Sequence, residues 1–150
     1  MVAYSFKPRF VLPIELGEKR QTIRGVGKKR HARSGDTLQL YTGPRMKPRK
    51  IGEATCESSS PITLAFGDAT KRPFVVFGDP QTAGPGEILI TPAELDEFAV
   101  LDGFADWQAL ADFWAETHAP LPAEWTGIIV RWGETFRGGL ALNPPAGAST

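Results

Sequence analysis

The sequence predicts an α+β fold: a small mixed, mostly antiparallel β-barrel with two or three flanking helices. Five to seven short strand-like segments, with alternating or β-branched apolar residues, occupy most of the chain, and two helix-like segments lie between 91 and 117. This order lacks the regular strand–helix alternation of a doubly wound sheet. The 150 residues suffice for one domain with a buried core, and 13 prolines and 16 glycines indicate many short elements and turns.

The first half of the chain is predicted to form one short helix and four strands. The helix covers 11–16, because Pro13 is tolerated in a first turn and Gly17 can take the left-handed stop position. Glycines and basic residues without apolar periodicity predict surface loops over 25–35 and 43–50. The expected strands cover 5–10, 20–24, 37–42 and 51–58, and the last two form a hairpin.

The second half is predicted to begin with a turn over 58–61 and a strand over 62–66. Strand-like stretches at 74–77 and 87–90 then flank a Pro/Gly-rich loop at 79–86, so the segment 67–90 is expected to be a peripheral hairpin or an insertion.

Two helices and one strand are expected to complete the domain, which covers 1–138. Thr91-Pro92-Ala93-Glu94 has a capping-box pattern with proline at the first helical position, and that helix ends near 101. A second helix over 106–117 places Trp107, Leu110, Phe113 and Trp114 on one face, where they are expected to join the core. The last strand covers 127–132, and the tail 139–150 is expected to be disordered.

A net charge of zero conceals a strong asymmetry. Residues 1–50 carry 13 Lys/Arg and three acids, a net of +10, so the other 100 residues carry four Lys/Arg and 14 acids, a net of −10. Such asymmetry suggests an anionic partner for the basic half. The alternative is that the two halves neutralise each other across one fold.

Composition excludes several classes of protein. No apolar run approaches the roughly 18 to 20 residues of a membrane span, and the first residues lack the order of a signal peptide, so no membrane association is expected. A single cysteine, Cys56, is compatible with a reducing cytoplasm, which is the expected location, and is expected to be a small buried filler. One cysteine and two distant histidines, His31 and His118, do not favour a zinc site, so we expect no metal and no cofactor.

Four motifs occur in a set order along the chain. They are a Gly-x-Lys-x-x-Thr-x-Arg pattern at 17–24, a basic loop that ends in Gly-Asp and a strand at 35–40, an Ile-Gly-Glu-Ala strand at 51–54, and Asp-Gly-Phe at 102–104 before a tryptophan-bearing helix. With these motifs the chain, over about 10–132, resembles the ASCH domain family of the PUA-like superfamily. The resemblance implies a β-barrel with flanking helices and a cleft at its mouth for RNA or nucleotide-like ligands.

One branch of that family hydrolyses the acyl amide of N-acylated cytidine with a lysine, a threonine and an acidic residue. By position, the resemblance assigns these catalytic roles to Lys19, Thr22 and Asp102. The branch has a glutamate where this chain has Asp102, whose side chain is one methylene shorter. The segment 67–90, the longer basic loop and the tail are further departures from the small hydrolases.

The residues by themselves allow the same site to catalyse or only to bind. In a strand, Thr22 and Arg24 point to one face, and Lys19 just before it can fold over that face. A desolvated lysine can take the proton of a threonine hydroxyl, and a carboxylate can act as an acid or orient the base. Alternatively, the cations bind phosphate and Thr22 offers a hydrogen bond, or Asp102 caps the following helix.

The basic residues around this motif suggest a nucleic-acid-binding surface. Lysines and arginines that neutralise phosphates give salt-sensitive binding. An ordinary solvated loop is the alternative, with His31 as one of its solvent-facing members. The predicted function is binding of RNA or a modified nucleoside, with an amidohydrolase or a ribonuclease as alternatives. The predicted nucleic-acid-binding residues are Arg20, Arg24, Lys28, Lys29, Arg30 and Arg33.

Overall fold

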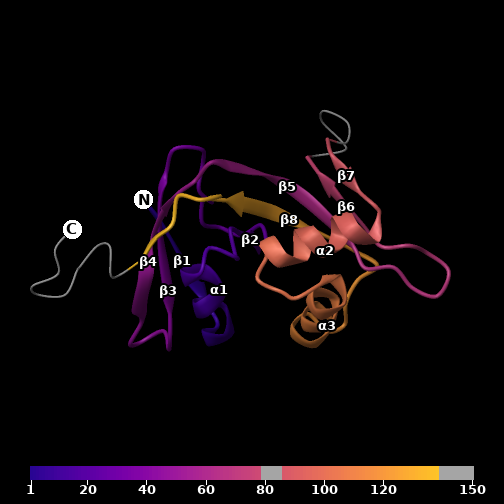
Figure 1. The fold of residues 1–150 in the computed structure, drawn as a ribbon, viewed down its shortest axis with the longest axis horizontal. Coiled ribbons are helices and arrows are strands. Elements are labelled where there is room, and N and C mark those ends of the chain that lie inside the picture. Colours follow the sequence, from indigo (N-terminus) through magenta and orange to yellow (C-terminus); the bar gives the residue numbers. More distant parts are fainter. Residues whose placement is uncertain (79–85, 139–150) are drawn as a thin grey trace, which may run out of the picture.

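The structure, a computed structural model, describes residues 1–78 and 86–138 and folds them into two β-sheets and three α-helices (Figure 1). Of the predicted segments, the tail 139–150 and nearly all of the loop 79–86 lie outside the described residues. One sheet has the strand order β1-β3-β4-β9 and the other β2-β8-β5-β6-β7. Only the β1–β3 pair is parallel among the described strand pairs, which confirms a mostly antiparallel α+β fold.

The first strand lies earlier in the chain than predicted. β1 covers Val2–Phe6 and pairs with β3 (Thr37–Thr42), whereas Pro8–Phe10 forms a short 3₁₀ helix, η1. Proline has a fixed φ and no N–H, so Pro8 favours the first turn of a helix over a strand. The helix α1, Val11–Glu15, follows directly, and Gly17 adopts φ +76°, which confirms the predicted stop.

The predicted turn over 58–61 is wrong, because these residues belong to one continuous strand. β5 covers Ser58–Ala65, and all eight of its residues pair with β8, Glu124–Arg131. The Pro61 carbonyl accepts a hydrogen bond from the N–H of Gly78, just beyond the end of β6 (Phe74–Phe77). In an antiparallel pair the nitrogen and the carbonyl of one residue point to the same neighbouring strand, so the Pro61 nitrogen also points towards the β6 side. Strand pairing with β6 begins only at Ile62, so the lack of an N–H at Pro61 is tolerated.

The predicted hairpins are confirmed at both ends of the molecule. β3 pairs antiparallel with β4, Arg49–Thr55, and β6 pairs antiparallel with β7, Ile88–Leu89, at the edge of its sheet. β2 covers Gln21–Arg24 and pairs with β8. β8 is not the last strand, however, because β9, Arg137–Gly138, returns to pair with β4 and joins the first sheet.

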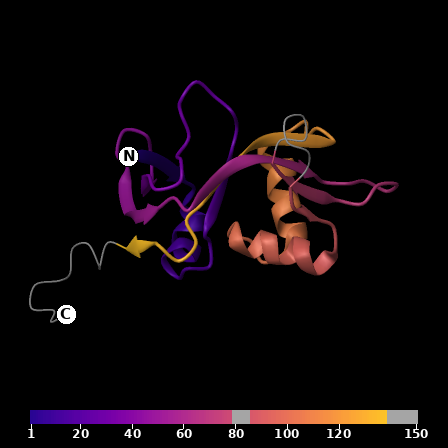
Figure 2. The ribbon, with the colours of Figure 1, turned by 90° about the horizontal axis from the view of Figure 1, so that it is seen from above.

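The two longer helices pack together beside the five-stranded sheet, as Figure 2 shows from above. α2 covers Pro92–Leu101 and begins with the predicted capping box at Thr91 and Glu94, and α3 covers Trp107–Thr117 and is capped by Asp106. Trp107 and Trp114 are buried in the core, as predicted, and so is Cys56. No helix within residues 1–78 and 86–138 is long and apolar enough to span a membrane.

Candidate functional site

The predicted cleft residues meet at one cavity of about 200 Å³. Its walls come from β1, η1, β2, the α2–α3 connection and α3, elements that lie far apart in the sequence. We call it the central cavity. It is lined by Ser5, Phe6, Lys7, Phe10, Lys19, Thr22, Ile23, Arg24, Asp102, Phe104, Phe113, Trp114 and His118. The lining thus includes Lys19, Thr22 and Asp102, together with Arg24.

A buried ion pair forms the floor of this site. Lys19 Nζ lies 3.6 Å from Asp102 Oδ1 and donates a hydrogen bond to the Asp102 carbonyl, and the two residues are only 3% and 5% exposed. Gln21 Nε2 approaches the same carboxylate oxygen at 3.5 Å. Burial lowers the pKa of Lys19 and raises that of Asp102, while their mutual attraction opposes both shifts. Burial therefore disfavours the charged form of both Lys19 and Asp102.

Gly103 allows this ion pair to form. Asp102 is the C-terminal cap of α2, and Gly103 follows it with φ +98°, a conformation that favours glycine. A Cβ at Gly103 would lie 3.0 Å from Lys19 Cδ and 3.0 Å from Phe10 Cδ1. The Asp-Gly pair of the sequence motif thus ends the helix and leaves room for the lysine stem.

Strand β2 positions the threonine and the arginine. Thr22 and Arg24 pair with Val130 and Ile128 of β8, two residues apart on one side of the strand. Arg24 Nε donates to Thr22 Oγ1 at 2.9 Å, and Arg24 Nη2 donates to the Ser5 carbonyl at 2.7 Å. Within the described residues the Thr22 hydroxyl accepts the bond from Arg24 and donates to no group, Lys19 included, so its own proton remains available to a ligand.

Aromatic rings make up much of the remaining wall. Lys19 Nζ lies 4.7 Å from the centre of the Phe10 ring, and Phe10 makes edge contacts with Phe104 and Phe113 at 5.5 and 5.6 Å between ring centres. The sequence predicted Phe113 and Trp114 to be core residues. It did not predict that Phe6 and Phe10 line the site. The signal that could have found the latter two is their position on either side of the basic segment Lys7-Pro8-Arg9.

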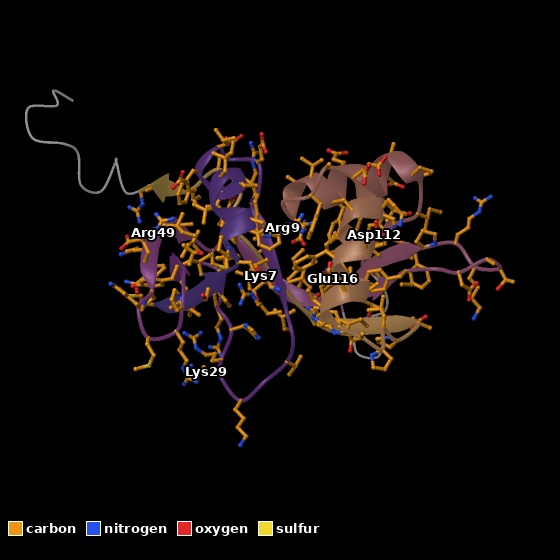
Figure 3. All side chains as sticks on the ribbon, turned by 90° about the horizontal axis from the view of Figure 1, so that it is seen from below. Lys7, Arg9, Lys29, Arg49, Asp112 and Glu116 are labelled. Atoms are coloured by element: carbon orange, nitrogen blue, oxygen red, sulfur yellow. The ribbon has the colours of Figure 1, made fainter. Side chains whose placement is uncertain are left out.

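The loop over 25–35 is anchored at its base and free at its tip. The Tyr4 hydroxyl accepts the N–H of Ala32 and contacts His31 Nδ1 at 3.0 Å, and His31 Nε2 donates to the Gly25 carbonyl at 2.9 Å. His31 was predicted to face solvent, and it is only partly exposed, because its ring stacks on Tyr4 and joins two segments. Figure 3 shows Lys29 at the far end of this extended loop.

The predicted nucleic-acid-binding residues divide into three groups. Arg24 lines the cavity, whereas Arg20 does not belong to its lining and forms an ion pair with Glu134 at 3.4 Å. Arg30 pairs with Asp36 at 3.3 Å. Of the predicted residues, Lys28, Lys29 and Arg33 are exposed and have no ion-pair partner within the described part of the chain.

Comparisons with protein-family models, with curated proteins and with solved structures found no match to this chain. No cluster of three or more His, Cys, Asp or Glu side chains suited to a metal ion occurs among residues 1–78 and 86–138. The central cavity itself presents ammonium, guanidinium, hydroxyl and carboxylate groups.

Proposed function

We propose that the chain is an ASCH domain of the PUA-like superfamily that binds a nucleoside, free or within RNA, in the central cavity. The observation that carries the proposal is the convergence of Lys19, Thr22, Arg24 and Asp102 on one aromatic-walled cavity. The first three come from one short motif, but Asp102 is 83 positions from Lys19. If the motifs occurred in this chain by chance, there would be no reason for residues so far apart in the sequence to line one cavity.

The groups in the cavity suit a nucleobase. A base presents a flat apolar face and an edge of hydrogen-bond donors and acceptors, and proteins bind unstacked bases through aromatic rings and polar groups at the edge. The cavity offers the rings of Phe6, Phe10 and Phe104 beside the Thr22 hydroxyl and the Asp102 carboxylate. Its volume of about 200 Å³ is below the range of roughly 300 to 1,000 Å³ for drug-sized ligands, which favours a single base.

The finer features of the resemblance belong to the same proposal. In a PUA-like barrel the two sheets would close around a common interior, and the hydrogen bond from Arg24 in β2 to Ser5 in β1 supports this, because it joins strands of different sheets. The segment 67–90 would be an insertion at the sheet edge. A single buried cysteine suits a reducing compartment such as the cytoplasm.

Calorimetric titration tests the proposal. Cytidine, N-acetylated cytidine and a short single-stranded RNA are each titrated into the full chain and into Thr22→Val, which keeps the side-chain shape and removes the hydroxyl. Lys71→Ala, an exposed change outside the cavity lining, is the matched control. We expect at least one probe to bind the wild type and the Lys71 variant equally and Thr22→Val more weakly. Absence of binding by all three probes would refute the proposed function.

An amidohydrolase is the second candidate, favoured by a lysine of lowered pKa that shares the cavity with Thr22. Neutral Lys19 would take the Thr22 proton as the hydroxyl oxygen attacks the acyl carbon. The C–N bond would then break, the amine nitrogen of cytidine would receive that proton, and water would hydrolyse the acyl ester on Thr22. Release of the acid from N-acetylated cytidine distinguishes this reaction from binding alone, and shortened RNA products would indicate a ribonuclease.

A further inference from the structure

The charges that line the central cavity do not cancel. Three lining residues, Lys7, Lys19 and Arg24, carry cationic side chains, whereas Asp102 is the single carboxylate in this described lining. Lys19 already pairs with Asp102 at 3.6 Å. Within the part of the chain that the structure describes, neither Lys7 nor Arg24 forms an ion pair with any carboxylate. Two positive charges therefore remain at the cavity.

Arg24 is held in place and remains charged. Its Nε and Nη2 donate to Thr22 Oγ1 and to the Ser5 carbonyl, and its guanidinium lies over the rings of Tyr4 and Phe6, at 5.1 and 4.9 Å from their centres. A guanidinium does not lose its proton in a protein. A half-buried charge without a counter-ion is unfavourable, so an anion at the cavity would be stabilised there.

Lys7 lies on the same rim. It follows β1 two residues after Ser5, the acceptor of the Arg24 hydrogen bond, which is a separation of about 7 Å along extended backbone. Its Nζ lies 5.4 Å from the centre of the Phe113 ring on α3. Figure 3 shows Lys7 where the N-terminal segment meets α3. α3 also carries the acids Asp112 and Glu116, but neither forms an ion pair with Lys7.

We propose that the central cavity takes a nucleotide in preference to a free nucleoside, and that Lys7 and Arg24 hold the phosphate attached to the bound nucleoside. The inference rests on the proposed function, because the base occupies the aromatic part of the same cavity. It names the ligand class and adds Lys7, which the sequence motif does not contain, as the residue that selects the phosphorylated form.

The geometry suits a phosphate group. Its oxygens accept charge-assisted hydrogen bonds, and one phosphate can contact a guanidinium and an ammonium together. Within the described residues, Nη1 of Arg24 has no hydrogen-bond partner, so it remains free to donate. This phosphate is distinct from those that the exposed Lys28 and Lys29 would contact, since their loop is anchored beyond the end of β2.

The test compares a nucleoside with its phosphates. Cytidine, N-acetylated cytidine and the 5′- and 3′-monophosphates of each are titrated into the full chain at one ionic strength. The variants are Lys7→Gln, Lys7→Arg and the control Lys71→Gln, all at exposed positions. A hydrogen bond to a charged group corresponds to about tenfold to hundredfold in affinity, so we expect one monophosphate to bind tighter than its nucleoside by such a factor.

The variants assign that advantage to Lys7. We expect Lys7→Gln to weaken monophosphate binding far more than nucleoside binding, so that most of the advantage is lost, and Lys7→Arg and Lys71→Gln to keep it. Equal binding of nucleosides and monophosphates would overturn this inference and leave the proposed function standing. An equal loss for nucleosides and monophosphates in Lys7→Gln would also overturn it. Absence of binding by every probe would refute the proposed function and this inference together.

Discussion

Lys19 and Asp102, 83 positions apart in the sequence, form a buried ion pair with 3.6 Å between Nζ and Oδ1. The pair joins the segment between α1 and β2 to the C-terminal cap of α2. It therefore ties the N-terminal motif to the helical part of the fold, and its two charged groups also line the central cavity. Stability and ligand binding should both depend on it.

Loss of the Asp102 charge should destabilise the fold strongly. Asp102→Asn keeps the side-chain shape but leaves the Lys19 ammonium buried without its counter-ion, and removal of one partner from a buried pair typically costs about 3–5 kcal/mol. Glu134→Gln is the matched control, because it breaks the exposed pair with Arg20, which should contribute less than about 1 kcal/mol. Urea unfolding at pH 7 measures both. Similar costs for the two variants would contradict the role of burial.

Alkaline titration should reveal the lowered pKa of Lys19. Burial disfavours the charged ammonium in the folded state, so the unfolded chain binds more protons in the window between the lowered folded pKa and the ordinary value of about 10.4. Across that window, the free energy of unfolding of the wild type should therefore rise with pH relative to Lys19→Met. Urea unfolding of both proteins from pH 8 to 10.5 gives the difference. A difference that stays constant would contradict the shift.

Hydrolysis of N-acetylated cytidine, where it occurs, should depend on the Thr22 hydroxyl. Thr22→Ala removes the attacking oxygen, and we expect the rate of acetate release to fall by at least about a thousandfold. Thr22→Ser keeps an oxygen at the same position and should retain measurable turnover. Chromatography of the nucleoside products follows both reactions. Wild-type turnover in Thr22→Ala would show that this hydroxyl is not the nucleophile.

The salt dependence of RNA binding should distinguish Lys28 and Lys29, which form no ion pair within the described residues, from Arg30, which does. Each phosphate contact on single-stranded RNA contributes about 0.7 to the slope of log affinity against log salt. Replacing both Lys28 and Lys29 with alanine should therefore reduce the slope by about 1.4. Arg30→Ala should change it less, because Arg30 already pairs with Asp36. Fluorescence anisotropy at several salt concentrations measures the slopes, and unchanged slopes would exclude contacts from this loop.

The sequence alone determined most of the local structure. Alternating residues predicted β3 and β4, Thr91 and Glu94 predicted the start of α2, and Gly17 predicted the end of α1. These predictions succeeded because the signals are local: a cap, a glycine with positive φ or an alternating face acts within a few residues. The motif at 17–24 likewise predicted Thr22 and Arg24 on one face of a strand, with Lys19 just before it.

The tertiary structure decided what depends on distant partners. By itself, Pro61 indicates a turn. It belongs to a strand because it pairs with β8, while strand pairing with β6 begins only at Ile62. The sequence predicts a solvent-facing His31, but Tyr4, 27 positions away, provides a hydrogen-bond partner for its ring. Lys7 at the cavity depends in the same way on where β1 and α3 pack. Sequence patterns record local preferences, whereas long-range packing sets which charges are paired and which remain for a ligand.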